Sequence, residues 1–236
     1  MVEYDFSNKI ALIVGGTGAV GSQLLKFFAS HEATTIGTYM DEGKMKSVRS
    51  ESQGSDFIRC NTLVDTELSY LINKMVEKYG RIDILVNTVG GFLGGKSVIQ
   101  IEEGDWDNMF AINLKSAFLV SRHVIPLMIQ SGYGRIVHIS SYTGLSAKGF
   151  DSAYAAAKAG LIRLVESVSN ETRDHDININ CVLPSIIDTE ANRKAMPNSD
   201  FKQWIKIKEL ANVIGFLCSE ESHAITGSAV PVLKPF

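Results

Sequence analysis

The chain has 236 residues and a formal net charge of −3, with 45% hydrophobic and 21% charged residues. This length suits one α/β domain, and the charge provides no basic field that would bind nucleic acid or a membrane surface. The first residues, MVEYDFSNKI, lack an apolar signal segment, and no apolar stretch approaches the ~20 residues of a membrane helix. We therefore expect a cytoplasmic protein with no nucleic-acid and no membrane partner.

The cysteines and histidines give no sign of a metal or redox site. Cys60, Cys181 and Cys218 have neither a CxxC spacing nor the spacing of metal ligands, so we expect them to be reduced and buried. The five histidines are scattered without pairing, and we predict no metal site.

Short apolar segments alternate with amphipathic segments, which predicts strands and helices in turn. The predicted strands cover 9–16, 33–40, 81–91, 134–141, 177–185 and 227–236, and the predicted helices cover 21–32, 65–80, 105–134, 152–176 and 208–222. Pro126 lies inside the third predicted helix, where we expect a kink. The repeated strand–helix–strand order predicts an α/β fold with a Rossmann-type, doubly wound parallel sheet, in a single domain over residues 1–236.

The first strand leads into a glycine-rich segment, LIVGGTGAVGS, that opens the first helix. Such a turn brings backbone N–H groups to the pyrophosphate of a dinucleotide at a helix N-terminus. A tight turn without a ligand is the alternative, but its place directly after the first strand favours dinucleotide binding. The predicted contacts are Gly15, Thr17, Gly18, Val20 and Gly21.

The end of the second strand bears on the choice between NAD and NADP. An acidic residue at this position binds the ribose 2′-hydroxyl of NAD, but the position is Thr38 or Tyr39, and Asp41 lies beyond the expected strand end. The missing acid favours NADP slightly. No arginine stands nearby, so Lys44 and Lys46 are the candidate partners of a 2′-phosphate.

A tyrosine and a lysine share one face of an alanine-rich helix. In SAYAAAKAG, Tyr154 and Lys158 are one helical turn apart. A chance surface pair is the plain alternative. A cation held close to the phenol would instead lower its pKa from ~10, which would suit a general acid in reduction and a general base in oxidation.

These motifs together resemble the short-chain dehydrogenase/reductase family over the whole chain. The family patterns TGxxxGxG, NNAG and YxxxK correspond to VGGTGAVG, NTVG and YAAAK, with departures at Val14, Ala19, Thr88 and Val89. The resemblance implies hydride transfer between an NAD(P) cofactor and a small-molecule carbonyl or alcohol. The resemblance also implies an assembly through the two long helices over 105–134 and 152–176. Apolar residues on their outer faces agree with this, so we expect a homodimer or homotetramer.

The resemblance also assigns the catalytic and binding residues. Ser141, thirteen residues before the tyrosine, would stabilise the carbonyl oxygen, Tyr154 would exchange the proton, Lys158 would hold the phenolate and the nicotinamide ribose, and Asn113 would hold a water on a proton path. Thr189 could bind the nicotinamide amide or cap a helix. The implied cofactor contacts are Asn61, Asn87, Gly90, Tyr154, Lys158, Pro184, Ile187 and Thr189.

Residues 186–206 form the expected substrate loop. This loop and GGFLGG resemble dihydropteridine reductase, a family member that lacks the serine, whereas GRIVHISS and YAAAKAGLIRLVES resemble 3-oxoacyl-[acyl-carrier-protein] reductase. We therefore expect carbonyl reduction of the 3-oxoacyl-thioester type, with pterin reduction as the alternative. A catalytically silent dinucleotide sensor is the alternative from another class, but the four retained catalytic residues favour an enzyme. Phe92, Phe150, Met196, Phe201 and Trp204 could line an apolar pocket or could simply pack within loops.

Overall fold

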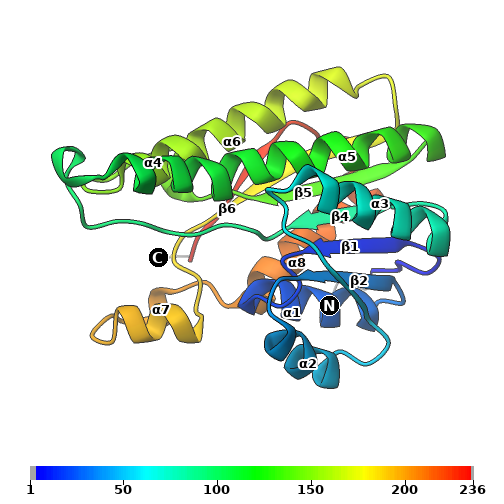
Figure 1. Cartoon of the computed structure of the whole chain (residues 1–236), viewed down its shortest axis with the longest axis horizontal. Coiled ribbons are helices and arrows are strands. Elements are labelled where there is room, and N and C mark those ends of the chain that lie inside the picture. The colour runs from blue at the N-terminus through cyan, green and yellow to red at the C-terminus, as the bar shows by residue number, and fades with distance from the viewer. Residues whose placement is uncertain (1–3, 235–236) are drawn as a thin grey trace.

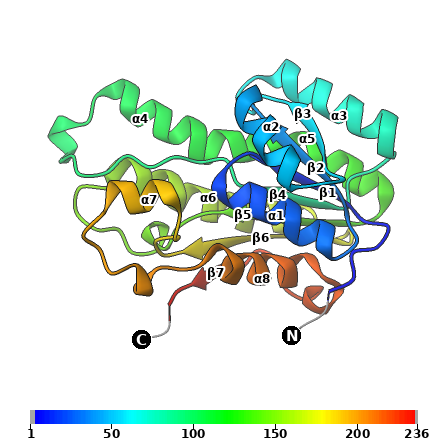
Figure 2. The ribbon, with the colours of Figure 1, turned by 90° about the horizontal axis from the view of Figure 1, so that it is seen from below.

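The computed structural model describes residues 4–234, which form one seven-stranded parallel sheet with helices on both faces (Figures 1 and 2). The strand order is β3-β2-β1-β4-β5-β6-β7, which confirms the predicted Rossmann-type sheet. The strands are β1 (Ile10–Val14), β2 (Thr34–Tyr39), β3 (Asp56–Arg59), β4 (Ile84–Asn87), β5 (Gly134–Ile139), β6 (Ile177–Pro184) and β7 (Ala229–Val232). The helices are α1 (Ala19–Ser30), α2 (Glu42–Glu51), α3 (Asp65–Tyr79), α4 (Glu103–Phe110), α5 (Ser116–Ser131), α6 (Ser152–Glu171), α7 (Glu190–Ala195) and α8 (Ile207–Cys218).

Two apolar cores cover the two faces of the sheet. Alternate strand residues point to opposite faces, so Leu12 and Val14 of β1 pack with α3, α5 and α6, whereas Ala11 and Ile13 pack with α1 and α8. Figure 1 shows these helix groups above and below the sheet. Because all strands are parallel, their carboxyl ends meet at one edge of the sheet, where ligands bind in such folds.

The predicted helix over 105–134 is interrupted. A π-helical turn, Ala111–Lys115, separates α4 from α5. Pro126 lies inside α5, which continues to Ser131, and the kink there stays a prediction. Helices α2 and α7 were not expected, because both are short, polar and without an apolar stripe. The predicted last strand, 227–236, contains the observed strand β7. Its last two residues, Pro235 and Phe236, lie outside the described residues.

The three cysteines are buried and free, as predicted. Burial raises the pKa of each thiol, to about 11 for Cys60 and about 12 for Cys181. Within residues 4–234, no group of His, Cys, Asp and Glu side chains is arranged to hold a metal ion. The same residues contain no helix that is both long and apolar enough to span a bilayer.

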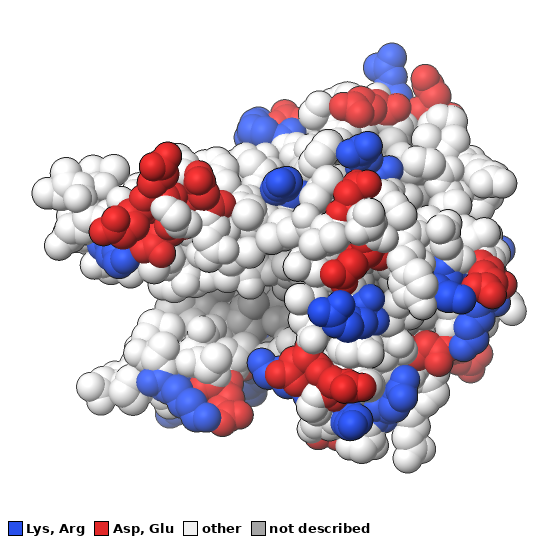
Figure 3. All heavy atoms as spheres, viewed as in Figure 1, with Lys and Arg blue, Asp and Glu red and all other residues white. Residues whose placement is uncertain are grey.

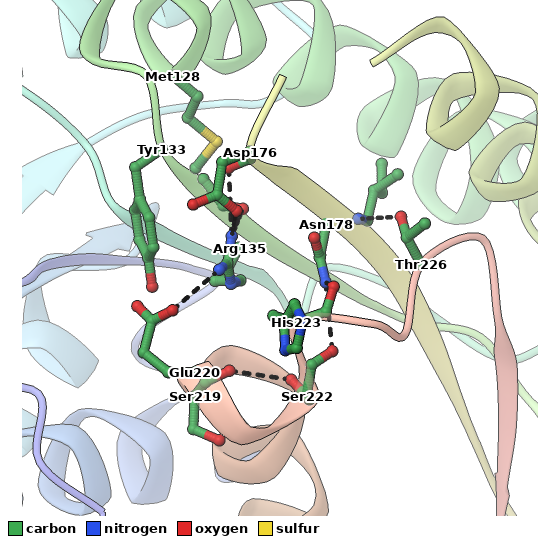
Figure 4. Close-up of polar contacts among 12 residues, drawn as sticks. Met128, Tyr133, Arg135, Asp176, Asn178, Ser219, Glu220, Ser222, His223 and Thr226 are labelled. Atoms are coloured by element: carbon green, nitrogen blue, oxygen red, sulfur yellow. Dashed lines mark hydrogen bonds and ion pairs between the residues drawn. The ribbon is translucent and has the colours of Figure 1, made fainter. Parts of the chain in front are cut away.

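A buried guanidinium joins three segments at the amino end of the sheet (Figure 4). Arg135 of β5 is fully buried, and its Nη atoms donate to Asp176 at 2.8 Å and to Glu220 at 3.2 Å. Its guanidinium also lies 4.3 Å from the centre of the Tyr133 ring. The two carboxylates therefore neutralise a buried charge and fasten the segments before β6 and after α8 to β5.

Removal of both carboxylates from this cluster should destabilise the fold. The double variant Asp176→Ala, Glu220→Ala leaves Arg135 buried without a counter-charge, and we expect the free energy of unfolding to fall by about 3 kcal/mol. Urea unfolding followed by circular dichroism measures this change. Asp174→Ala is the matched control, because that exposed carboxylate contacts only the exposed Arg173, at 4.0 Å. Equal stability of the two proteins would contradict the assigned role.

Candidate functional site

The glycine turn between β1 and α1 brings two backbone segments unusually close together. A Cβ atom on Gly21 would lie 2.2 Å from the carbonyl oxygen of Gly15, so no other residue fits there. The N–H of Gly15 donates to the hydroxyl of Thr38 at 2.9 Å, and Thr38 is only 2% exposed. The side chain of Thr38 therefore supports the turn, and its predicted contact with the cofactor stays a prediction. Thr17 and Gly18 lie on the turn itself and Val20 lies in the first turn of α1, which fits a pyrophosphate bound at the helix N-terminus.

No free acid stands at the end of β2. Tyr39 is the last residue of the strand and is half-buried. Asp41 caps α2, where its carboxylate accepts a hydrogen bond from the N–H of Lys44 at 2.9 Å. Beyond β3, the side chain of Asn61 accepts from the N–H of Leu63 at 3.0 Å and closes a local turn. Its predicted contact with the adenine stays a prediction.

The structure brings Ser141, Tyr154 and Lys158 together at the carboxyl end of β5. Lys158 is 4% exposed; its Nζ donates to the carbonyl of Ile139 at 2.7 Å and lies 5.7 Å from the centre of the Tyr154 ring. The hydroxyl of Ser140 donates to the carbonyl of Lys158 at 2.9 Å, which fastens α6 to this strand end. Ser141 caps the 3₁₀ turn that follows, and its hydroxyl accepts from the N–H of Thr143.

The expected lowering of the phenol pKa is wrong for this structure. Burial raises the pKa of Tyr154; the hydroxyl of Ser141 opposes this shift, and the carboxylate of Asp151 adds to it. Burial also lowers the pKa of Lys158 to about 8. The ammonium donates to a backbone carbonyl, and desolvation is the largest cause of the pKa shift of both groups. Tyr154 is therefore a neutral phenol at neutral pH, and this form can give up a proton.

Asn113 lies inside the π-helical turn and is 1% exposed. Its amide Nδ2 donates to the carbonyls of Gly91 and Met109, both at 3.0 Å, and its Oδ1 accepts from the N–H of Gly91 at 3.2 Å. A Cβ on Gly90 would lie 2.9 Å from Asn113 Oδ1 and 3.3 Å from Lys158 Nζ. Asn113 thus sits beside the lysine, and a side chain at position 90 would crowd both groups. The predicted water on this asparagine stays a prediction.

A buried histidine, not predicted from the sequence, supports the end of β4. Asn87 is 2% exposed; its Oδ1 accepts from the N–H of Val89 at 3.2 Å, and its amide nitrogen lies 3.4 Å from His138 Nδ1. His138 Nε2 lies 3.0 Å from the hydroxyl of Ser121. Burial lowers the pKa of His138 to about 4, so the ring is neutral. The sequence feature that could have identified this histidine is its place as a polar residue within the predicted strand GRIVHIS.

The segment after β6 carries the remaining predicted contacts. Pro184 ends the strand, and Ile187 pairs with Ile205 in an isolated parallel bridge. The hydroxyl of Thr189 accepts from the N–H of Asn192 at 3.1 Å and caps α7, so the helix-cap alternative is confirmed. The nicotinamide contact stays a prediction. Figure 3 shows a deep indentation between the part of the molecule that carries α4 and the part that carries α7, with charged side chains on its rims.

The comparisons with known proteins agree with this geometry. A family model described as "Enoyl-(Acyl carrier protein) reductase" matches residues 17–233. The 3-oxoacyl-[acyl-carrier-protein] reductase of Thermotoga maritima is 31% identical over 95% of this chain and 96% of its own length. The chain belongs to the short-chain dehydrogenase/reductase family. It is therefore an NAD(P)-dependent oxidoreductase, as the sequence predicted.

Further relatives agree over nearly the whole chain. The 3-oxoacyl-[acyl-carrier-protein] reductase of Escherichia coli is 29% identical over 97% of both chains. A short-chain dehydrogenase/reductase structure from Burkholderia xenovorans has a TM-score of 0.87 at 29% identity, covering 98% of this chain and 97% of that one. Levodione reductase has a TM-score of 0.90 at 21% identity, covering 97% of both chains, and shows the fold alone.

The depressed pKa of Lys158 predicts a pH-dependent stability. The unfolded lysine keeps its proton up to pH ~10.4 and the folded one only to about 8. Between these values the unfolded chain binds more protons, so this group adds stability as the pH rises. We expect the stability of the wild type relative to Lys158→Met to increase between pH 7 and pH 10, by about 2 kcal/mol.

Urea unfolding of both proteins at several pH values measures this difference. The buried thiols and Tyr154 have raised pKa values and act in the opposite direction at high pH. They are present in both proteins, so they cancel in the comparison, apart from the part of the Cys181 shift that the charge of Lys158 causes. A difference in stability that stays constant with pH would contradict the assignment.

Proposed function

We propose that the chain reduces a ketone to an alcohol with NADPH, and that 3-oxoacyl thioesters are the first substrates to test. The observation that carries this proposal is the half-buried, neutral phenol of Tyr154, with the Ser141 hydroxyl and the Lys158 ammonium beside it. A reduced carbonyl leaves an alkoxide, which needs a proton donor and a stabilising hydrogen bond. The names of the curated relatives support the substrate class.

In this mechanism each residue acts at one stated atom. Bound NADPH supplies the hydride. The Ser141 hydroxyl now donates to Thr143 Oγ1 at 3.2 Å, and it would turn this proton toward the substrate oxygen as charge develops there. Tyr154 would then give its phenolic proton to that oxygen. Lys158 would stabilise the phenolate left behind, and Asn113 would help to return a proton from solvent.

The alternatives differ in the group that receives the hydride. The description of the matched family model names an enoyl reductase, in which a carbon–carbon double bond would receive the hydride. The alternative suggested by the sequence is the reduction of a dihydropteridine. A serine hydroxyl beside the phenol suits a carbonyl oxygen, because two donors then meet one developing charge. The relatives described above include no dihydropteridine reductase, so carbonyl reduction is the function that we propose.

The choice of NADPH rests on the end of β2. The carboxylate of Asp41 is engaged in capping α2, so it is not free to accept the ribose 2′-hydroxyl of NAD. Lys44 and Lys46 are exposed on α2, on either side of the buried Met45. Both ammonium groups stand within the helix that follows β2 and provide the positive charge that a phosphate requires.

We expect NADPH to bind more tightly than NADH. The double variant Lys44→Ala, Lys46→Ala should weaken NADPH binding about tenfold, because a charge-assisted contact is lost. Fluorescence titration of the reduced cofactors measures both dissociation constants. NADH is the internal control, because it lacks the 2′-phosphate and its affinity should stay unchanged. Tighter binding of NADH by the wild type would reverse the assignment.

We also propose that a second copy of the chain covers the outer face of α4, α5 and α6. Phe118 of α5 is 44% exposed at this face, and acidic and basic side chains flank it. Such a mixture of apolar and oppositely charged groups can pair with its own copy about a twofold axis. The surface depression here is lined by Asp107, Phe110, Ala111, Leu114, Lys115, Phe118, Gly160, Arg163 and Leu164.

The decisive experiment replaces the proposed proton donor. Tyr154→Phe should lower kcat for ketone reduction by about 10²–10⁴-fold, because the ring stays in place and only the transferable proton is lost. NADPH affinity should remain close to that of the wild type. Tyr70→Phe is the matched control, since Tyr70 is exposed on α3, and it should leave turnover unchanged. Unaltered rates in Tyr154→Phe would refute the mechanism.

A further inference from the structure

An exposed aromatic ring packs directly on the proposed proton donor. Phe92, in the loop after β4, is 67% exposed. Its ring meets the ring of Tyr154 edge to face, with the centroids 5.0 Å apart and the planes at 84°. One side of the Phe92 ring is thus fixed by Tyr154, while most of its surface remains open to a ligand. The mechanism proposed above gives no role to this contact.

The loop is built to hold this ring in place. A Cβ on Gly94 would lie 2.3 Å from Phe92 Cζ, so any side chain at position 94 would expel the ring from its position. The N–H of Gly95 donates to the carbonyl of Phe150 at 2.9 Å. This hydrogen bond joins the loop after β4 to the loop before α6, so both loops border Tyr154.

The second loop carries an exposed phenylalanine in a rare backbone conformation. Phe150 has φ +69°, in the left-handed region that non-glycine residues seldom adopt. Its side chain is 62% exposed, so packing within the core does not explain this conformation. Backbone strain of this kind is characteristic of ligand sites. Two open aromatic rings therefore stand on joined loops beside one catalytic candidate.

The segment that carries Phe92 is apolar, whereas the loop before α6 also carries Lys148 and Asp151, whose carboxylate acts on Tyr154. Residues 91–95 carry no charged side chain, and the nearby Lys96 is neutralised by Asp105 at 2.6 Å. Leu145, in the second loop, is 51% exposed. Aromatic faces favour flat rings over flexible chains, because offset stacking adds to the burial of apolar area. The side of the site formed by residues 91–95 therefore suits an uncharged, flat group next to the reacting carbonyl.

We propose that Phe92 is a specificity-determining residue, whose open face binds a flat unsaturated ring attached to the carbonyl that Tyr154 protonates. This inference rests on the proposed ketone reduction and narrows its substrate class: aryl or conjugated cyclic ketones are favoured over saturated linear ketones of the same size, so the linear 3-oxoacyl thioesters serve as the first assay of ketone reduction and not as the preferred substrates. Phe150 forms the second apolar side of this subsite.

The test compares two ketones with equal numbers of carbon atoms, acetophenone and 2-octanone, with NADPH as cofactor. Phe92→Leu keeps the apolar volume but removes the flat face, so kcat/KM for acetophenone relative to 2-octanone should fall about fivefold or more. Ile99→Ala is the matched control, since Ile99 is 91% exposed on the same connection between β4 and α4, and it should leave the ratio unchanged.

A binding measurement separates this inference from the proposed function. Calorimetric titration of acetophenone into the NADP⁺ complex of Tyr154→Phe, with and without Phe92→Leu, needs no turnover. Weaker binding with Phe92→Leu supports the subsite even if the wild type reduces neither ketone, and that result would refute only the proposed ketone reduction. Equal affinity in the two proteins, no detectable binding, or an unchanged kcat/KM ratio in active Phe92→Leu overturns the role of Phe92.

Discussion

The buried ammonium of Lys158 is the constraint on which the site depends. A cation that is 4% exposed needs a fixed partner, and the carbonyl of Ile139 at the end of β5 supplies it. This contact fixes the start of α6 against the sheet and thereby sets where Tyr154 points. Because burial brings the pKa of the lysine to about 8, the group can gain or lose a proton near neutral pH at little cost.

The surrounding elements enclose this charge almost completely. The π-helical turn places Asn113 next to Lys158, and Gly90 provides the gap between them. On the other side, Ser140 binds the backbone of α6. Three separate chain segments thus meet where parallel strands end, and this convergence lets a regular α/β fold hold a reactive group.

Much of the fold and part of the site could be predicted from local sequence patterns. Continuous apolar strands, the glycine turn and the one-turn spacing of Tyr154 and Lys158 each follow from short-range rules. The roles of Thr38 and His138 could not be predicted, because both depend on partners from other strands. The direction of the Tyr154 pKa shift also required the structure, since burial is set by loops that are distant in sequence, including the one that carries Phe92.

The three buried thiols have a practical consequence. Only the thiolate reacts with alkylating reagents, and burial both shields the sulfur atoms and raises their pKa values. Cys60 directly follows β3, Cys181 lies in β6, and Cys218 is the last residue of α8. Each thiol therefore reports on a different part of the molecule. The rate at which iodoacetamide labels each cysteine would measure how often that part opens to solvent.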